Sequence, residues 1–132
     1  MIAILDYGVG NLFSLSGSLK ALGLETEITG DPARLQAADR IILPGVGAFR
    51  DARAKLEEAG LVPVLKKEAE RKPLLGICLG MQLLFDTSME YGMHKGLGLI
   101  PGQVEDLKGA LTDKTLKVPH MGWNRLEIRS EE

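Results

Sequence analysis

Cys78 stands between two glycines in a pattern that suits a cysteine nucleophile. The apolar run that begins at Leu74 continues through Gly-x-Cys-x-Gly toward a helix-like segment. A sharp strand-to-helix turn requires small residues two places before and two places after the nucleophile, and Gly76 and Gly80 meet that requirement. The sequence therefore predicts a nucleophile elbow, in which the helix start favours the thiolate and the N–H of Leu79 faces a developing oxyanion. The competing interpretation is a small cysteine buried in a core.

Two further glycine-rich turns follow apolar runs. Pro44-Gly45-Val46-Gly47 comes directly after the run that ends at Leu43, and its glycines would let backbone N–H groups face a ligand. It is predicted to supply a second oxyanion donor at the carboxyl end of a neighbouring strand, or else to be an ordinary turn. The turn from Tyr7 to Phe13 is similar to a dinucleotide-binding fingerprint, but Phe13 stands in place of the third glycine, which disfavours a cofactor site.

The chain has two histidines, His94 and His120. A cysteine nucleophile needs an imidazole to take its proton, usually one oriented by a carboxylate. His94 lies beside Lys95 in a glycine-rich stretch and is expected to face solvent. His120 follows an apolar run and Pro119, so spacing alone would nominate it as the base.

Short apolar runs that alternate with helical periodicity predict an α/β fold with a mainly parallel sheet. Helices are predicted from Leu12 to Leu22 with Asn11 as N-cap, from Pro32 to Leu35 with Asp31 as N-cap, and on both sides of Gly60. The expected strands are 2–5, 26–29, 40–43 and the buried strand 74–77.

Two further expectations concern the charged residues and the end of the chain. The mixed charges between Leu61 and Arg71, which include Glu68, predict a solvated helix face. After Gly92 the pattern changes, and short apolar runs separated by Gly and Pro predict strands at 97–100, 116–118 and 125–128.

Composition excludes several classes of protein. The 132 residues are 45% hydrophobic, which suits one globular domain spanning 1–132. The net charge of −2 provides no electrostatic attraction to nucleic acid or to anionic membranes. No apolar stretch reaches the ~20 residues of a membrane span. The first apolar run has no basic residues before it and ends at Asp6, so we do not expect it to be a signal peptide. The single cysteine excludes an internal disulfide and suits a reducing compartment, so we expect a cytoplasmic protein.

Taken together, Pro44–Gly47, Gly76–Gln82 and Pro119–Asn124 resemble the class I glutamine amidotransferases, and the resemblance extends from residue 1 to about residue 128. The resemblance implies a flavodoxin-like parallel sheet flanked by helices, with an added antiparallel strand region after about residue 96. It also implies that Cys78 attacks the glutamine amide through a thioester. The other implied roles are an oxyanion hole at Leu79, Val46 and Gly47, and substrate binding by Gln82 and Glu90. Neither a cofactor nor a metal is implied.

The resemblance further implies that ammonia passes to a partner, a (β/α)₈-barrel cyclase subunit of histidine biosynthesis, which would lie against Met121, Trp123 and Asn124. The family's catalytic histidine lies late in the chain with a glutamate two positions on, whereas Gly122 stands two positions after His120. We therefore expect the 132 residues to be an N-terminal portion that lacks the final strands and is inactive alone. Another cysteine hydrolase with the same elbow, or a non-catalytic α/β binding module, are the alternatives.

Overall fold

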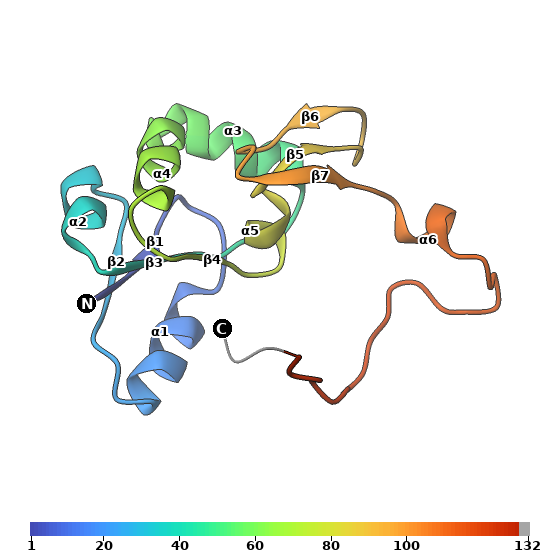
Figure 1. Ribbon diagram of the computed structural model, residues 1–132, viewed down its shortest axis with the longest axis horizontal. Helices are drawn as coiled ribbons and strands as arrows, with labels where there is room; N and C mark the ends of the chain where they lie inside the picture. The colour runs from blue at the N-terminus through green and yellow to red at the C-terminus, as the bar shows by residue number, and fades with distance from the viewer. Residues whose placement is uncertain (130–132) are drawn as a thin grey trace.

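A four-stranded parallel sheet organises the first half of the chain in the computed structural model, which describes residues 1–129 (Figure 1). Residues 130–132 of the expected domain lie outside the described residues. The strands run in the order β2-β1-β3-β4, which is the flavodoxin-like order. The four predicted strands are confirmed, with the fourth ending one residue earlier than expected: β1 (Ile2–Leu5), β2 (Thr26–Thr29), β3 (Arg40–Leu43) and β4 (Leu74–Gly76).

Helices cover both faces of this sheet. On one face lies α1 (Leu12–Ala21), and on the other lie α2 (Pro32–Ala37), α3 (Phe49–Glu58) and α4 (Leu61–Ala69), as Figure 1 shows. The predicted N-caps are confirmed: the side chain of Asn11 accepts a hydrogen bond from the Ser14 N–H at 3.2 Å, and that of Asp31 accepts one from the Ala33 N–H at 2.9 Å. Gly60 separates α3 from α4 with φ +67°, a conformation that costs glycine little.

The main core lies between the sheet and α2, α3 and α4. Because successive strand residues point to opposite faces, alternate residues of β1 and β3 meet the helices. These are Ala3, Leu5, Ile41 and Leu43, and they pack with Leu35 of α2, Phe49, Ala52 and Leu56 of α3, and Leu61, Val62 and Leu65 of α4.

The outer strand β4 is less covered than predicted. It pairs with β3 alone among residues 1–129, and the side chain of Leu75 is 56% exposed, so the expectation of a buried strand was wrong. An apolar groove of about 390 Å³ runs along this edge on the α1 side, between Leu19, Ile42 and Leu74. The edge therefore keeps unpaired backbone groups and apolar surface.

A smaller sheet follows the elbow segment. It is mixed, since β5 (Phe85–Ser88) pairs antiparallel with β6 (His94–Lys95) and parallel with β7 (Ile100–Val104). The added strand region thus begins at residue 85 and is only partly antiparallel. Of the predicted strand 97–100, only the last residue belongs to β7, because the positive φ of Gly98 makes the preceding residues a turn. Pro101 and Gly102, residues of the kind expected to separate the strands after Gly92, lie inside β7. This is an edge strand with an irregular register, which is where sheets tolerate them.

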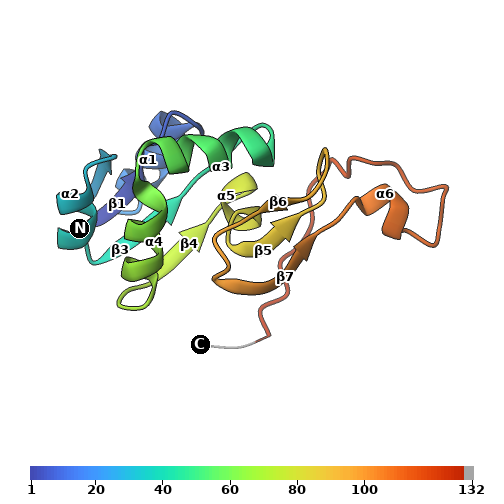
Figure 2. The same cartoon turned by 90° about the horizontal axis from the view of Figure 1, so that it is seen from above.

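Beyond β7 the chain runs away from both sheets through the short helix α6 (Leu107–Ala110) (Figure 2). The predicted strands at 116–118 and 125–128 were wrong, since both segments are irregular and exposed. No sheet edge lies beside them to take up their backbone hydrogen bonds, and apolar runs form strands only with such a partner. In the part of the chain that the structure describes, no helix is long and apolar enough to cross a membrane.

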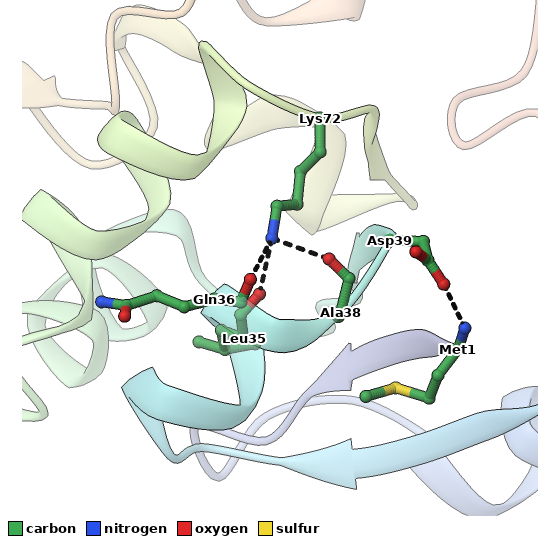
Figure 3. Close-up of polar contacts among 6 residues, drawn as sticks. All are labelled: Met1, Leu35, Gln36, Ala38, Asp39 and Lys72. Carbon is green, nitrogen blue, oxygen red and sulfur yellow. Dashed lines mark hydrogen bonds and ion pairs between the residues drawn. The ribbon is translucent and has the colours of Figure 1, made fainter.

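The expectation that the charged face of α4 is solvated was wrong at Glu68, which is buried. Its side chain is only 1% exposed, and its Oε2 lies 2.9 Å from the Nζ of Lys72. The Lys72 ammonium also donates to the carbonyl oxygens of Leu35, Gln36 and Ala38 at the end of α2, at 3.0, 2.8 and 2.7 Å (Figure 3). Because these carbonyls lack partners inside the helix, Lys72 caps α2 while it neutralises Glu68. Beside it, the N-terminal ammonium of Met1 pairs with Asp39 (Figure 3).

Removing the Lys72 charge is expected to destabilise the fold. Lys72→Met keeps an unbranched side chain but leaves Glu68 and the end of α2 without their partner. We expect the free energy of unfolding, measured by urea denaturation at pH 7, to fall by about 2–3 kcal/mol.

Lys67→Met is the matched control, since Lys67 is exposed on α4, the helix that carries Glu68, and its loss should change stability by less than about 0.5 kcal/mol. The hydrogen bond from Lys72 also lowers the pKa of Glu68 from its ordinary value of 4.5. The ionised pair therefore stabilises the fold above pH 4.5, and this contribution is lost as the pH falls through the lowered value. A Lys72→Met protein with the stability and acid sensitivity of the unsubstituted chain would contradict this assignment.

Candidate active site

Cys78 occupies a strained turn between β4 and α5 (Leu79–Gln82). Its φ of +55° and ψ of −119° are rarely adopted by a residue with a side chain. The thiol is exposed, so the interpretation of Cys78 as a buried core cysteine was wrong. Strain at a single exposed side chain is the geometry of a nucleophile elbow.

The glycines around Cys78 are required by close backbone contacts. A β-carbon built on Gly80 would lie 1.9 Å from the carbonyl oxygen of Leu43, and one on Gly76 would lie 2.5 Å from the Cα of Met81. Real β-carbons do not approach other atoms so closely. The predicted need for small residues two places before and two places after Cys78 is therefore confirmed. The helix that follows is only four residues long, and the chain enters β5 at Phe85.

The second glycine-rich turn lies against the elbow. β3 pairs with β4, so the turn that follows Leu43 emerges beside Gly76 at the same edge of the sheet. A β-carbon on Gly45 would come within 2.7 Å of the Gly80 nitrogen. Farther along the turn, Val46 is 57% exposed and Gly47 has φ +91°, with nothing within 4 Å of its β-carbon position. The segment predicted to hold the second oxyanion donor thus lies next to the elbow and is open to solvent.

Tyr7 is a residue of this region that the sequence did not single out for chemistry. It follows β1, and its buried hydroxyl donates a hydrogen bond to the Pro44 carbonyl at 2.7 Å. Burial raises the pKa of Tyr7 to about 12, so the hydroxyl remains a donor throughout the physiological range. The sequence signal available for Tyr7 was a Tyr-Gly dipeptide at the end of a strand. That dipeptide does not predict that the Tyr7 hydroxyl donates to the Pro44 carbonyl.

Gln82 and Glu90 line one groove, of about 540 Å³, together with Tyr91, Glu105 and Leu107. Gln82 ends α5, whereas Glu90 lies in the loop between β5 and β6. The Oε1 of Glu90 also accepts a hydrogen bond from the backbone N–H of Phe49, the first residue of α3, at 3.2 Å. The structure thus places the two predicted substrate-binding residues together, and it connects one of them to the turn after β3.

With this geometry established, comparison with known proteins identifies the family. Residues 3–131 match the family model described as glutamine amidotransferase class-I. The chain belongs to this family.

Its relatives in the family are similar over most of this chain. They include the proteins named "Imidazole glycerol phosphate synthase subunit HisH" of Sulfurimonas denitrificans, 53% identical over 127 residues, and of Moorella thermoacetica, 54% identical over 128 residues. These alignments cover 96% of this chain but 61% and 59% of the two relatives. The chain therefore spans about three fifths of the length of these curated relatives.

Solved structures share the class I amidotransferase fold. A crystal structure of a glutamine amidotransferase superposes with a TM-score of 0.66 at 23% identity, over 77% of this chain and 54% of that one. A peptidase E protein of Listeria monocytogenes EGD-e gives 0.58 at 14% identity, over 75% of this chain and 62% of that one. At these identities the comparison shows the fold alone, and it agrees with the observed parallel sheet.

The two histidines of this amidotransferase chain lie in different settings. His94 belongs to β6 and is half-buried, and its Nε2 lies 3.1 Å from the Tyr91 carbonyl in an exposed contact, so it faces solvent in part, as expected. His120 lies in the exposed segment after α6, where its Nε2 is 2.8 Å from the side-chain nitrogen of Asn124. Within residues 1–129, no hydrogen bond joins either imidazole to Cys78 or to a carboxylate.

The residues predicted to face a partner are all solvent-exposed. Trp123 is fully exposed and Met121 is 86% exposed. Over the described range, no group of three or more His, Cys, Asp and Glu side chains could hold a metal ion.

Filling the space at Gly80 is expected to break the elbow. Gly80→Ala places a methyl group against the Leu43 carbonyl, so β3 and α5 must separate. We expect the free energy of unfolding to fall by about 2–3 kcal/mol or more, and alkylation of Cys78 by iodoacetamide to change in rate.

Gly17→Ala is the matched control. Gly17 lies within α1 with nothing inside 4 Å of its β-carbon position, so alanine should stabilise the chain by about 0.5–1 kcal/mol. Equal stability of the two variants would show that the elbow is not tightly packed.

Proposed function

We propose that this chain is the glutaminase part of imidazole glycerol phosphate synthase, hydrolysing glutamine to glutamate and ammonia through a thioester on Cys78. The observation that carries the proposal is the exposed, strained Cys78, in an elbow whose Gly80 packs against the start of the Pro44–Gly47 turn. The names of the relatives that match over 96% of the chain support the same function.

In the proposed reaction the thiolate of Cys78 attacks the side-chain amide carbon of glutamine. The carbonyl oxygen becomes an oxyanion, which the N–H of Leu79 and the peptide between Val46 and Gly47 would stabilise. The Leu79 N–H belongs to the first turn of α5, where helix amides have no partner in the helix. As the C–N bond breaks, the nitrogen takes a proton and leaves as ammonia. Water then attacks the thioester, and the C–S bond breaks to give glutamate and the free thiol.

Gln82 and Glu90 would hold the amino-acid end of the substrate. The Glu90 carboxylate suits an α-ammonium group, and the Gln82 amide can donate to an α-carboxylate. The two side chains line the same groove, which supports a shared role in binding. Glutamine would then extend from this groove toward Cys78.

The expected partner is the (β/α)₈-barrel cyclase subunit, which would consume the ammonia. The surface proposed to meet it includes Met121, Trp123 and Asn124, and its exposed aromatic and thioether side chains are of the kind that anchor interfaces.

We expect residues 1–132 to react at Cys78 but to turn glutamine over very slowly. The elbow needs only the thiolate to form a bond with an electrophile, whereas turnover also needs an imidazole to move protons, a contribution of about 10²–10⁴-fold. A chloromethyl ketone analogue of glutamine is the appropriate probe, because its ketone carbon stands where the amide carbon would. The Cys78 thiolate adds to that carbon and forms an oxyanion; the sulfur then moves to the adjacent carbon, chloride leaves and the carbonyl re-forms. Labelling should saturate, be slowed by glutamine and disappear in Cys78→Ser, while a coupled glutamate assay records negligible turnover.

Two results would contradict this account. Labelling no faster than that of glutathione at the same pH would remove the proposed nucleophile. Rapid hydrolysis by residues 1–132 that is lost in His120→Ala would make His120 the base.

Trp123→Ala is expected to weaken binding to the cyclase subunit. The fully exposed indole has no packing to lose in the isolated chain, so its removal should raise the Kd about tenfold or more with little change in thermal stability. Calorimetric titration with the barrel subunit measures the effect. Leu126→Ala, 92% exposed on the same segment, is the control and should leave the Kd within about twofold. A tryptophan variant that loses stability but not affinity would refute the interface.

A further inference from the structure

The turn between β3 and α3 is held at both of its ends by side chains from distant parts of the chain. At the first end, the Tyr7 hydroxyl donates to the Pro44 carbonyl at 2.7 Å across 37 positions of sequence. At the second end, Glu90 Oε1 accepts from the Phe49 N–H at 3.2 Å across 41 positions. The turn is therefore fixed by tertiary contacts at Pro44 and Phe49.

Beyond Gly45, which packs against the elbow, the turn has little support of its own. Val46 is exposed, and Gly47 has open space around its β-carbon position. Ala48 is the N-cap of α3 and provides no side-chain hydrogen bond, so Glu90 supplies the cap that the local sequence lacks. The orientation of the Val46-Gly47 peptide thus depends on how its two anchors are placed.

We propose that Tyr7 and Glu90 are positioning residues for the oxyanion turn, and that Glu90 couples this turn to the amino-acid end of the bound substrate. The inference rests on the proposed glutaminase function. Neither residue needs to touch the reacting amide.

The Tyr7 anchor lies where the turn meets the elbow. Pro44 precedes Gly45, whose β-carbon position is 3.0 Å from the Tyr7 hydroxyl and 2.7 Å from the Gly80 nitrogen. A shift of Pro44 would therefore move the turn relative to Cys78 and the Leu79 N–H. Because an oxyanion donor works only near hydrogen-bonding distance, a displacement of about 1 Å can cost about 10²-fold in rate.

The Glu90 side chain belongs both to the turn and to the groove that contains Gln82. One carboxylate oxygen accepts from Phe49, and the side chain also lines the groove that contains Gln82. An ammonium group bound in that groove would meet the same carboxylate that caps α3. Ligands with an α-amino group would thus act on the turn through Glu90, and ligands without one would not.

Tyr7→Phe tests the first anchor, because it removes one hydroxyl and keeps the buried ring. With the chloromethyl ketone analogue of glutamine we expect the limiting labelling rate to fall about tenfold, with the half-saturating concentration unchanged within about twofold. Iodoacetamide forms no oxyanion, so its reaction with Cys78 should keep its rate. Ser18→Ala removes a hydroxyl that bonds only within α1 and should match the unsubstituted chain.

Glu90 variants separate its two roles. Glu90→Gln keeps an oxygen that accepts from Phe49 but loses the charge, so the half-saturating concentration should rise while the limiting rate is retained. Glu90→Ala loses both the accepting oxygen and the charge, so the half-saturating concentration should rise and the limiting rate should fall. A limiting rate equal in Glu90→Gln, Glu90→Ala and the unsubstituted chain would overturn the role of Glu90.

Amide hydrogen exchange in segment 44–49 provides a second measurement that does not depend on the reaction. In Tyr7→Phe its exchange should accelerate about tenfold without global destabilisation. If Tyr7→Phe changes neither the limiting labelling rate nor the exchange of segment 44–49, the proposal is overturned. It is also overturned if the variant slows the chloromethyl ketone analogue and iodoacetamide equally. Unsaturable labelling of the unsubstituted chain would instead refute the glutaminase function, and the exchange result would still decide whether Tyr7 positions the turn.

Discussion

The contact between Gly80 and the Leu43 carbonyl is the constraint on which the candidate site depends. The two backbones approach so closely that no side chain fits between them. This approach places the turn after β3 directly beside the turn after β4, where the Cys78 thiol is exposed. The strain at Cys78 persists because the surrounding backbone leaves it no other conformation.

The order of the sheet makes that contact possible. Parallel strands direct all their carboxyl ends to one edge, and the pairing of β3 with β4 brings their following turns together. The turn after β1 lies at the same edge, where a β-carbon on Gly10 would come within 3.1 Å of the Pro44 side chain. Gly10, Gly45 and Gly80 thus let three separate turns pack closely at this edge.

Polar side chains complete the structure where helices end. Lys72 caps α2, and Glu90 caps α3, each from a distant part of the chain. Both helix ends lack sufficient local caps, so their stability depends on tertiary contacts. For Glu90 this dependence has a functional meaning under the proposed glutaminase reaction, since the same carboxylate lines the substrate groove. The apolar edge of β4 and the exposed segment after α6 are, by contrast, surfaces that contacts within residues 1–129 leave uncovered.

The local features could be predicted from the sequence alone. Four strands, their helices, the caps at Asn11 and Asp31 and the small residues around Cys78 follow from periodicity, propensity and the space available within a turn, all of which are set by near neighbours. The features that depend on residues far apart in the sequence could be found only in the tertiary structure. Glu68 is buried because Lys72 and the end of α2 surround it, and Pro101 fits inside β7 because that strand lies at an edge. The apolar runs at 116–118 and 125–128 form no strands, since backbone pairing needs a partner that no local pattern specifies. For the same reason the hydrogen bonds of Tyr7 to Pro44 and of Phe49 to Glu90 could not be predicted, because their partners meet only when the sheet is assembled.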